Sequence, residues 1–166
     1  MTLTVDNKVT PTITWSTPTP ITYGTALSAT QLNASSGGVA GIMTYSPAAG
    51  TALAGGTQTL SVTFTPTDTT DYNPVIQTVS LTVNKGSIAI NGTSSLSPSL
   101  FGDNVTATFT FTGAGVTPTG TTTIMDGDVT LATVPLNAGV ATYSSSALFA
   151  GSHTLKAVYN GDDNYE

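Results

Sequence analysis

One strand-and-turn pattern occurs twice in this chain and constrains the fold more than any other feature. Thr59-Leu60 in the first copy recurs as Thr154-Leu155 in the second, and in both copies apolar residues then alternate with polar ones, the period of a half-buried strand. Each strand runs into an Asp-rich turn that ends on Asp-Tyr or Asn-Tyr. The alternating apolar residues are Leu60, Val62 and Phe64 in the first copy and Leu155, Ala157 and Tyr159 in the second. This recurrence predicts tandem copies of one small β domain.

Length and composition exclude several classes of protein. The 166 residues accommodate two domains of roughly 80 residues each. Without Cys there are no disulfides, zinc knuckles or thiol catalysis. Nine acidic residues face three Lys and no Arg, which argues against nucleic-acid binding and against anionic membranes. No apolar run approaches the ~20 residues of a spanning helix, so we expect no membrane insertion; any export signal is expected outside this sequence.

The phase of the repeats predicts the domain limits. Leu3-Thr4-Val5 reappears as Leu81-Thr82-Val83, which belongs to the expected last strand of the first domain. Residues 1–8 are therefore interpreted as a leading strand, either the last strand of a preceding repeat or a donor strand. Residues 9–84 then form domain 1, and residues 85–166 form domain 2, which is expected to lack its closing strand.

The alternation predicts about seven short strands in a domain and no amphipathic helix, which is typical of an Ig-like β-sandwich. We expect Trp15 in the core of domain 1. In domain 2, Asp126-Gly127 is the strongest hairpin signal, and the chain also passes through Leu100-Phe101. The short linker, residues 84–86, suggests that the two domains stack end to end. The strands expected are residues 12–15, 21–23, 27–34, 42–45, 57–65, 75–83, 88–90, 105–111, 120–125, 129–136, 140–143 and 153–159.

Stretches in both domains carry a family resemblance. PTGTTTIMDGDVTLATVPL and GSHTLKAVYNGDDNY in domain 2 resemble bacterial Ig-like domain repeats, and ITWSTPTPITYGTALSATQLNA in domain 1 is similar to related repeats of long, Thr-rich surface proteins. The resemblance implies tandem Ig-like sandwiches in a large exported adhesin or surface protein, an extracellular or bacterial cell-surface location, and no catalytic residues. Thr122 departs from the apolar residue that is usual at its position.

Few residues are candidates for chemistry. His153 is the sole His, and with no G-x-S-x-G elbow around any Ser we interpret it as structural, as the counterpart of Gln58. No catalytic, cofactor-binding or metal-ligating residue is assigned. Carboxylates on end loops could hold Ca²⁺, but turns capped by Asp account for the same pattern. The candidate calcium ligands are Asp126, Asp128, Asp162 and Asp163, with Asp68 and Asp71 in the equivalent loop of domain 1.

These observations predict a non-enzymatic structural or adhesive module that acts as a stalk or spacer beside neighbouring Ig-like repeats. An open strand edge in domain 2 invites self-association, with Thr2–Val5 of one molecule completing domain 2 of the next as a head-to-tail filament. The alternative is that the chain is a fragment of a longer array of repeats. A further alternative is a glycan- or receptor-binding module that uses end loops such as residues 35–39 or 113–119. We expect the aromatic residues mainly on the apolar faces of strands, which disfavours glycan binding.

Overall fold

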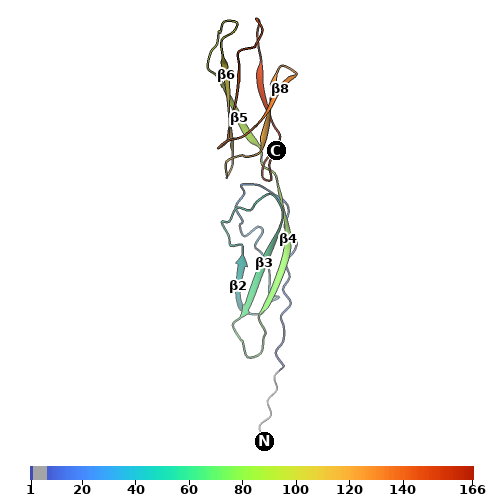
Figure 1. Ribbon diagram of the computed structural model, residues 1–166. Helices are drawn as coiled ribbons and strands as arrows, with labels where there is room; N and C mark the ends of the chain where they lie inside the picture. The colour runs from blue at the N-terminus through green and yellow to red at the C-terminus, as the bar shows by residue number, and fades with distance from the viewer. Residues whose placement is uncertain (2–6) are drawn as a thin grey trace. The chain divides into compact units, whose positions relative to one another are not determined.

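The computed structural model describes residue 1 and residues 7–166, and the chain forms two compact units, Met1–Asn84 (unit 1) and Lys85–Glu166 (unit 2). Figure 1 shows strands and connecting loops in both units. The described residues contain no helix, and hence none that is long and apolar enough to cross a membrane. The predicted all-β class is therefore confirmed. The leading segment Thr2–Val5 lies outside the described residues.

Unit 1 is built on one four-stranded sheet. Its strands are β1 (Ile21–Thr22), β2 (Gly41–Ser46), β3 (Gly56–Pro66) and β4 (Val75–Asn84), in the spatial order β1-β4-β3-β2. β4 runs antiparallel to β3 and parallel to β1. β3 turns Leu60, Val62 and Phe64 into the core, where none is more than 1% exposed. The predicted alternating strand is thus confirmed, and it is covered on both sides by neighbouring strands.

Two predicted strands of unit 1 are wrong. Residues 12–15 make a single isolated bridge, and residues 27–34 form turns. In the second stretch the side-chain oxygen of Gln31 accepts hydrogen bonds from the backbone N–H and the hydroxyl of Ser28, both at 3.1 Å. Local side-chain bonds of this kind compete with a β ladder, so the segment turns instead of extending.

Trp15 lies in the core of unit 1, as predicted. Its indole Nε1 donates to the Gln31 carbonyl at 2.9 Å, and its ring meets that of Tyr45 edge-on, with centroids 5.4 Å apart. The indole N–H is therefore satisfied although the side chain is buried.

Unit 2 contains two facing three-stranded sheets. The first has the order β5-β6-β9 and the second the order β10-β7-β8. Apolar side chains from both sheets, including Phe109, Phe111 and Ile124, share one core between them. This sandwich agrees with the predicted Ig-like fold. The strands are β5 (Ile88–Ser94), β6 (Val105–Gly113), β7 (Thr121–Asp126), β8 (Val129–Pro135), β9 (Val140–Ser145) and β10 (Leu155–Tyr159).

Three details of unit 2 bear on the sequence predictions. The Asp126-Gly127 hairpin joins β7 to β8, with Gly127 at a φ of 56° that favours glycine. Thr122 is fully buried, and its hydroxyl donates to the Val158 carbonyl at 2.8 Å, which explains how a polar residue is tolerated there. Leu100-Phe101, by contrast, lies in a turn and not on a strand.

The two units begin in the same way. In unit 1, Val9 forms a parallel bridge to Tyr72, and in unit 2, Gly86 forms a parallel bridge to Tyr165. Each bridge attaches the first residues of the unit to the Asp-rich turn that follows its repeated strand, β3 or β10. The recurrence read from the sequence is therefore also a recurrence of backbone pairing.

Candidate functional site

Asp162 organises the Asp-rich turn of unit 2. One carboxylate oxygen accepts the N–H groups of Asn164 and Tyr165, both at 2.8 Å, and the other accepts the N–H and the hydroxyl of Thr119, both at 2.9 Å. Partial burial of the carboxyl opposes its ionisation, but these hydrogen bonds outweigh it and lower the pKa of Asp162 to about 2. Asp68 makes the shorter version of this turn in unit 1, accepting from Thr70 and Asp71.

Asp126 and His153 form a second cluster. His153 Nδ1 lies 2.5 Å from an Asp126 carboxylate oxygen, and Nε2 lies 2.8 Å from the Phe149 carbonyl oxygen. Both neighbours are acceptors, so only the imidazolium, with two N–H donors, satisfies both. The hydrogen bond to Phe149 and the one to Asp126 raise the pKa of His153. The bonds from His153 and from the Thr154 N–H lower the pKa of Asp126 against a smaller effect of burial.

His153 repeats the role of its counterpart in unit 1. The side-chain amide of Gln58 donates to the Ala54 carbonyl at 3.1 Å, four residues earlier in the chain, as His153 does to Phe149. In both units this residue ties the preceding loop to the start of the repeated strand. The contacts of His153 are thus of the same kind as those of Gln58.

The carboxylates proposed for Ca²⁺ do not converge. Asp126 and Asp162 have both oxygens engaged by protein donors, and they belong to different clusters, at the two ends of the β7–β10 pair. Asp128 forms an exposed ion pair with Lys156 at 3.2 Å, and Asp163 is exposed. Among the described residues no group of three or more His, Cys, Asp or Glu side chains is placed to hold a metal ion.

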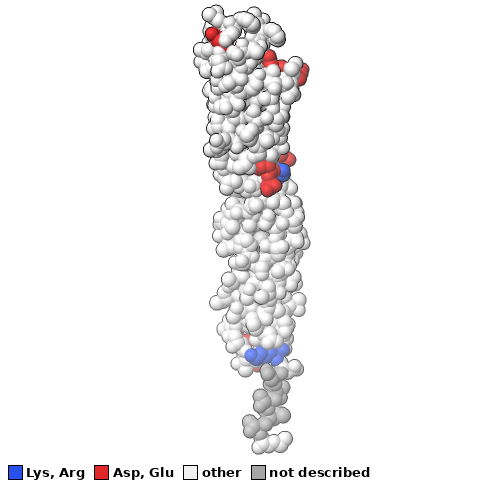
Figure 2. Space-filling model, in the orientation of Figure 1, with Lys and Arg blue, Asp and Glu red and all other residues white. Residues whose placement is uncertain are grey.

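Charge is sparse over the whole surface seen in Figure 2, where only small groups of Lys, Asp and Glu interrupt the uncharged residues. The total is nine acidic residues and three Lys. On the face that Figure 2 shows, the described basic side chains form no extended stripe.

The edge of unit 2 beside β10 differs from the equivalent place in unit 1. In unit 1, β3 lies between β2 and β4. In unit 2, β10 pairs with β7 on one side, and the described residues place no strand on the other. The consequence is visible in burial: three positions that are at most 1% exposed in β3 have only half-buried counterparts in β10. These counterparts are Leu155, Ala157 and Tyr159.

A cavity of about 590 Å³ opens at this edge. One wall is the segment 151–155 at the start of β10, and the opposite wall is the loop 96–99. Between the walls lie Val105, Ala107 and Phe109 of β6, which belong to the core, and the polar residues Thr93 and Ser94 of β5. We call this cavity the edge slot.

The segment 151–154 is not a strand, although its counterpart 56–59 is part of β3. The pairing explains the difference. In unit 1, residues 56–59 pair with β4 alone, because β2 pairs with β3 only from Ser61 onward. In unit 2, pairing with β7 begins at Leu155. Residues 151–154 therefore have the sequence of a strand without a strand beside them.

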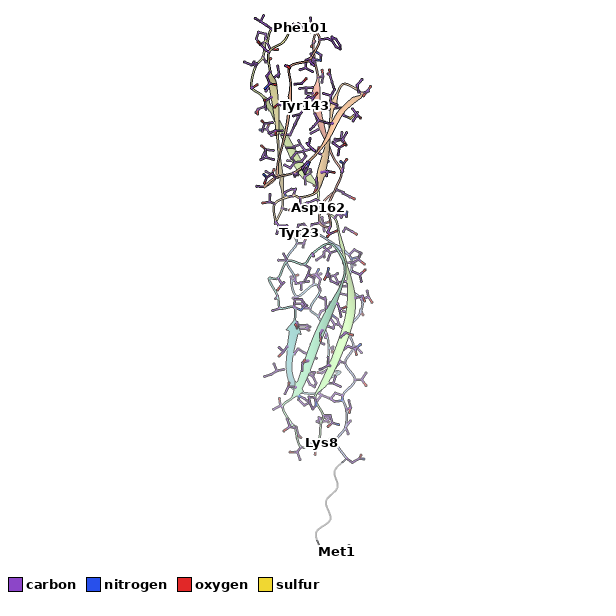
Figure 3. All side chains as sticks on the ribbon, viewed as in Figure 1. Met1, Lys8, Tyr23, Phe101, Tyr143 and Asp162 are labelled. Atoms are coloured by element: carbon purple, nitrogen blue, oxygen red, sulfur yellow. The ribbon has the colours of Figure 1, made fainter. Side chains whose placement is uncertain are left out.

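Exposed apolar side chains gather in the loops at one end of unit 2. Phe101 is 75% exposed and Phe149 is 81% exposed, and Leu96 and Leu100 are exposed as well. Figure 3 shows Phe101 at the end of unit 2 opposite Asp162. The expectation that aromatic residues fall mainly on apolar strand faces is wrong for these two. The Leu-Phe doublets at 100–101 and 148–149, each beside a Gly- and Ser-containing loop, were the available signal in the sequence.

The two loops that the sequence suggested for binding, residues 35–39 and 113–119, lie in different surroundings. Residues 37–39 of the first loop help to line an open cavity of about 720 Å³ in unit 1, together with Tyr72. The second loop, 113–119, is held to the Asp162 turn, because Thr119 donates to Asp162 and the Tyr165 hydroxyl donates to the Val116 carbonyl at 2.7 Å. It is thus part of the internal structure of unit 2.

Comparison with known families supports the Ig-like assignment for unit 2. Residues 92–166 match the family described as Bacterial Ig-like domain (group 3). The matched stretch starts within β5 and covers the sandwich, the edge slot and the Asp162 turn. The predicted resemblance to bacterial Ig-like domains is therefore confirmed for this unit. Comparison with curated proteins and with solved structures gave no significant match.

Proposed function

We propose that this chain is a non-catalytic structural module of a bacterial extracellular or cell-surface protein. It serves as a stalk or spacer and joins other Ig-like units by strand addition at the open edge of β10. The family match of unit 2 supports the module class, because Ig-like domains of this kind act as structural units of exported proteins.

The observation that carries the assembly is the difference between β3 and β10. Leu60 is fully buried under a complete sheet, whereas Leu155 at the equivalent position is half-buried at an edge. Covering an apolar side chain in such a place with a further strand lowers the free energy, because apolar surface is removed from water. An edge with unfilled apolar positions pairs readily with another chain, and a contact between unlike surfaces propagates head to tail.

The test is the mass and shape of the purified full chain. Light scattering and electron microscopy over a range of protein concentrations should show concentration-dependent assembly, with elongated particles. A variant without residues 1–6 should remain a monomer under the same conditions. If the full chain keeps the 16.7 kDa mass of a monomer at every concentration, assembly by strand addition is wrong.

The exposed apolar end of unit 2 favours a second candidate, a receptor-binding module. Phe101 and Phe149 offer two ring faces on loops, which is how protein and glycan receptors are contacted. A double variant, Phe101→Ser with Phe149→Ser, should lose adhesion to host or bacterial cells in a flow assay. Ile76→Ser removes an equally exposed apolar side chain from β4 and serves as the control. Equal adhesion of both variants would exclude this candidate.

A further inference from the structure

The open cavity of unit 1 lies at a place that unit 2 fills with its own side chains. Its volume is about 720 Å³, and it lies between the loop before β2 and the turn after β3. The lining consists of residues 37–40 on one side and of Thr67, Asp68 and Tyr72 on the other. We call it the loop cavity. Its size is within the range of about 300–1,000 Å³ that is usual for small-ligand sites.

The turn on one side of the loop cavity recurs in unit 2. One carboxylate oxygen of Asp68 accepts the N–H groups two and three residues later, as one oxygen of Asp162 does. Tyr72 follows this turn and forms the parallel bridge to the first residues of unit 1, as Tyr165 does in unit 2. Asp68 therefore corresponds to Asp162, and Tyr72 corresponds to Tyr165.

The loop on the other side of the cavity recurs as well. Residues 20–27 (PITYGTAL) align with residues 98–105 (PSLFGDNV), and the glycine in each has nearly the same φ, 90° and 94°. Extended without a gap, this alignment places Ser35 at Gly113, and both pair antiparallel with an early segment of their own unit. The loops that follow these two residues and lead into β2 and β7 therefore correspond to each other.

In unit 2 the place of the loop cavity is closed. Pro118, in the loop before β7, is fully buried, and so is Tyr165, whose hydroxyl donates to the Val116 carbonyl. Thr119 donates its N–H and its hydroxyl to the second oxygen of Asp162, both at 2.9 Å. Apolar surface and two donors on one carboxylate oxygen thus fill this space from within unit 2.

In unit 1 the place is open because the corresponding loop carries two consecutive glycines. Gly37 and Gly38 have φ values of 65° and 97°, and no atom lies within 4 Å of the position that a Cβ of Gly38 would take. Tyr72 is only half-buried. Within the described part of the chain, the second oxygen of Asp68 accepts no hydrogen bond. The oxygen and the aromatic ring that unit 2 engages internally are therefore available to a ligand in unit 1.

The contacts in unit 2 also indicate the chemistry of that ligand, which must donate hydroxyl hydrogens to a carboxylate and cover an aromatic ring. A neutral sugar does both, since its hydroxyl groups donate and its C–H groups form an apolar face. An anionic ligand is disfavoured, because the lining holds a carboxylate and no cationic side chain. We propose that the loop cavity binds a neutral sugar residue of a glycan, with Asp68 as the acceptor and Tyr72 as the ring against which the sugar packs.

Amide NMR spectra of the full chain can locate the ligand. Glucose, galactose, mannose and N-acetylglucosamine are the probes, each added alone at millimolar concentrations. At least one should shift the amide signals of residues 37–40 and 67–72, with a Kd on the order of 1 mM for a single sugar residue. N-acetylneuraminic acid, which is anionic, should bind at least about 10-fold more weakly.

A matched pair of variants tests the acceptor. Asp68→Asn keeps one oxygen for the turn but replaces the other with an NH₂ donor, so sugar binding should weaken about 10-fold or more. Asp71→Asn removes the same charge from an exposed position in the same turn that does not line the cavity, and it should bind as the native chain does.

A second pair tests the ring. Tyr72→Leu keeps apolar bulk but removes the aromatic face, and it should lose most of the binding, whereas Tyr72→Phe should keep it. Urea unfolding followed by Trp15 fluorescence shows that unit 1 remains folded in every variant, since Trp15 lies in the core of that unit.

Two results would overturn the proposal. If none of the four neutral sugars shifts the amides of residues 37–40 and 67–72, the loop cavity is not a sugar site. Shifts that persist unchanged in both Asp68→Asn and Tyr72→Leu would mean that the sugar binds elsewhere. Assembly by strand addition is measured by mass and shape, so it stands or fails independently of this site.

Discussion

Replacing Asp162 with alanine should destabilise unit 2 far more than the same replacement at the adjacent Asp163. The carboxylate accepts four hydrogen bonds, two from its own turn and two from Thr119 in the preceding loop. At about 0.5–1 kcal/mol net for each bond in this half-exposed place, the loss is about 2–4 kcal/mol. Asp68→Ala, which removes two bonds within one turn, should cost about 1–2 kcal/mol on the same scale, and Asp163→Ala should be close to neutral.

Urea unfolding can assign the loss to the correct unit. Trp15, the only Trp, lies in unit 1, so its fluorescence follows that unit alone, while circular dichroism follows both. With a slope of about 1–2 kcal/mol/M, Asp162→Ala should lower the midpoint of unit 2 by about 1–4 M and leave the Trp15 transition in place. A shift no larger than that of Asp163→Ala would refute the reasoning that Asp162 closes this part of unit 2.

The pH dependence gives an independent reading of Asp162. Its folded pKa of about 2 lies below the ordinary value of 3.8, so its stabilising contribution is complete above about pH 4 and is lost as the pH falls toward 2. Asp162→Asn, which keeps an acceptor oxygen but not the charge, should differ most from the native chain near neutral pH and converge with it near pH 2. A gap that stays constant over this interval would mean that the charge is not what holds the turn.

The remaining predictions concern other contacts of the two units. His153 has a raised pKa, so its contribution should be complete below pH 6.5 and lost as the pH rises above that value; His153→Gln should remove this dependence in thermal melts, and persistence of the dependence would reject the assignment. Leu60→Ala should cost about 2–5 kcal/mol and Leu155→Ala no more than about half as much in the monomer, as measured by urea unfolding, because only Leu60 is covered on both sides. Gly113→Ala would press its Cβ against the Tyr165 ring and should cost about 1–3 kcal/mol; an unchanged midpoint would show that the ring yields freely. Millimolar Ca²⁺ and a chelator should give the same Tm, since Asp126 and Asp162 are engaged by protein donors and the described carboxylates do not converge, and a rise of several degrees with Ca²⁺ would contradict this.

The strands that could be predicted are those in which apolar and polar side chains alternate and the backbone also pairs with a neighbouring strand. β3, β4, β6 and β7 alternate cleanly and were found close to their expected limits. The stretch 27–34 failed because Ser28 and Gln31 bond to each other locally. The alternation of apolar and polar residues does not reveal such bonds. It shows which positions are apolar, but not which side-chain acceptors compete for backbone donors.

The candidate site was only partly readable from the sequence. The repeated Leu-Thr-Val triplet and the phase of the repeats pointed to an open edge, but not to the two walls of the slot. Finding those walls required the pairing of β4 with both β1 and β3, which no local pattern of residues 97–99 or 151–154 encodes. The exposure of Phe101 was equally hidden, because its counterpart, Tyr23, packs against the core of unit 1.

The contrast between residues 56–59 and 151–154 shows where the information for a strand lies. The two segments, GTQT and GSHT, share Gly at the first position and Thr at the last, and both are tied to the preceding loop by the same side-chain hydrogen bond. Only the first is a strand, and β4 pairs with all four of its residues. The two segments are thus alike in their local sequence and in the side-chain hydrogen bond that holds them. Pairing with a neighbouring strand decides whether the segment becomes a strand. The difference between residues 56–59 and residues 151–154 therefore arises from the strand beside them and not from their own sequence.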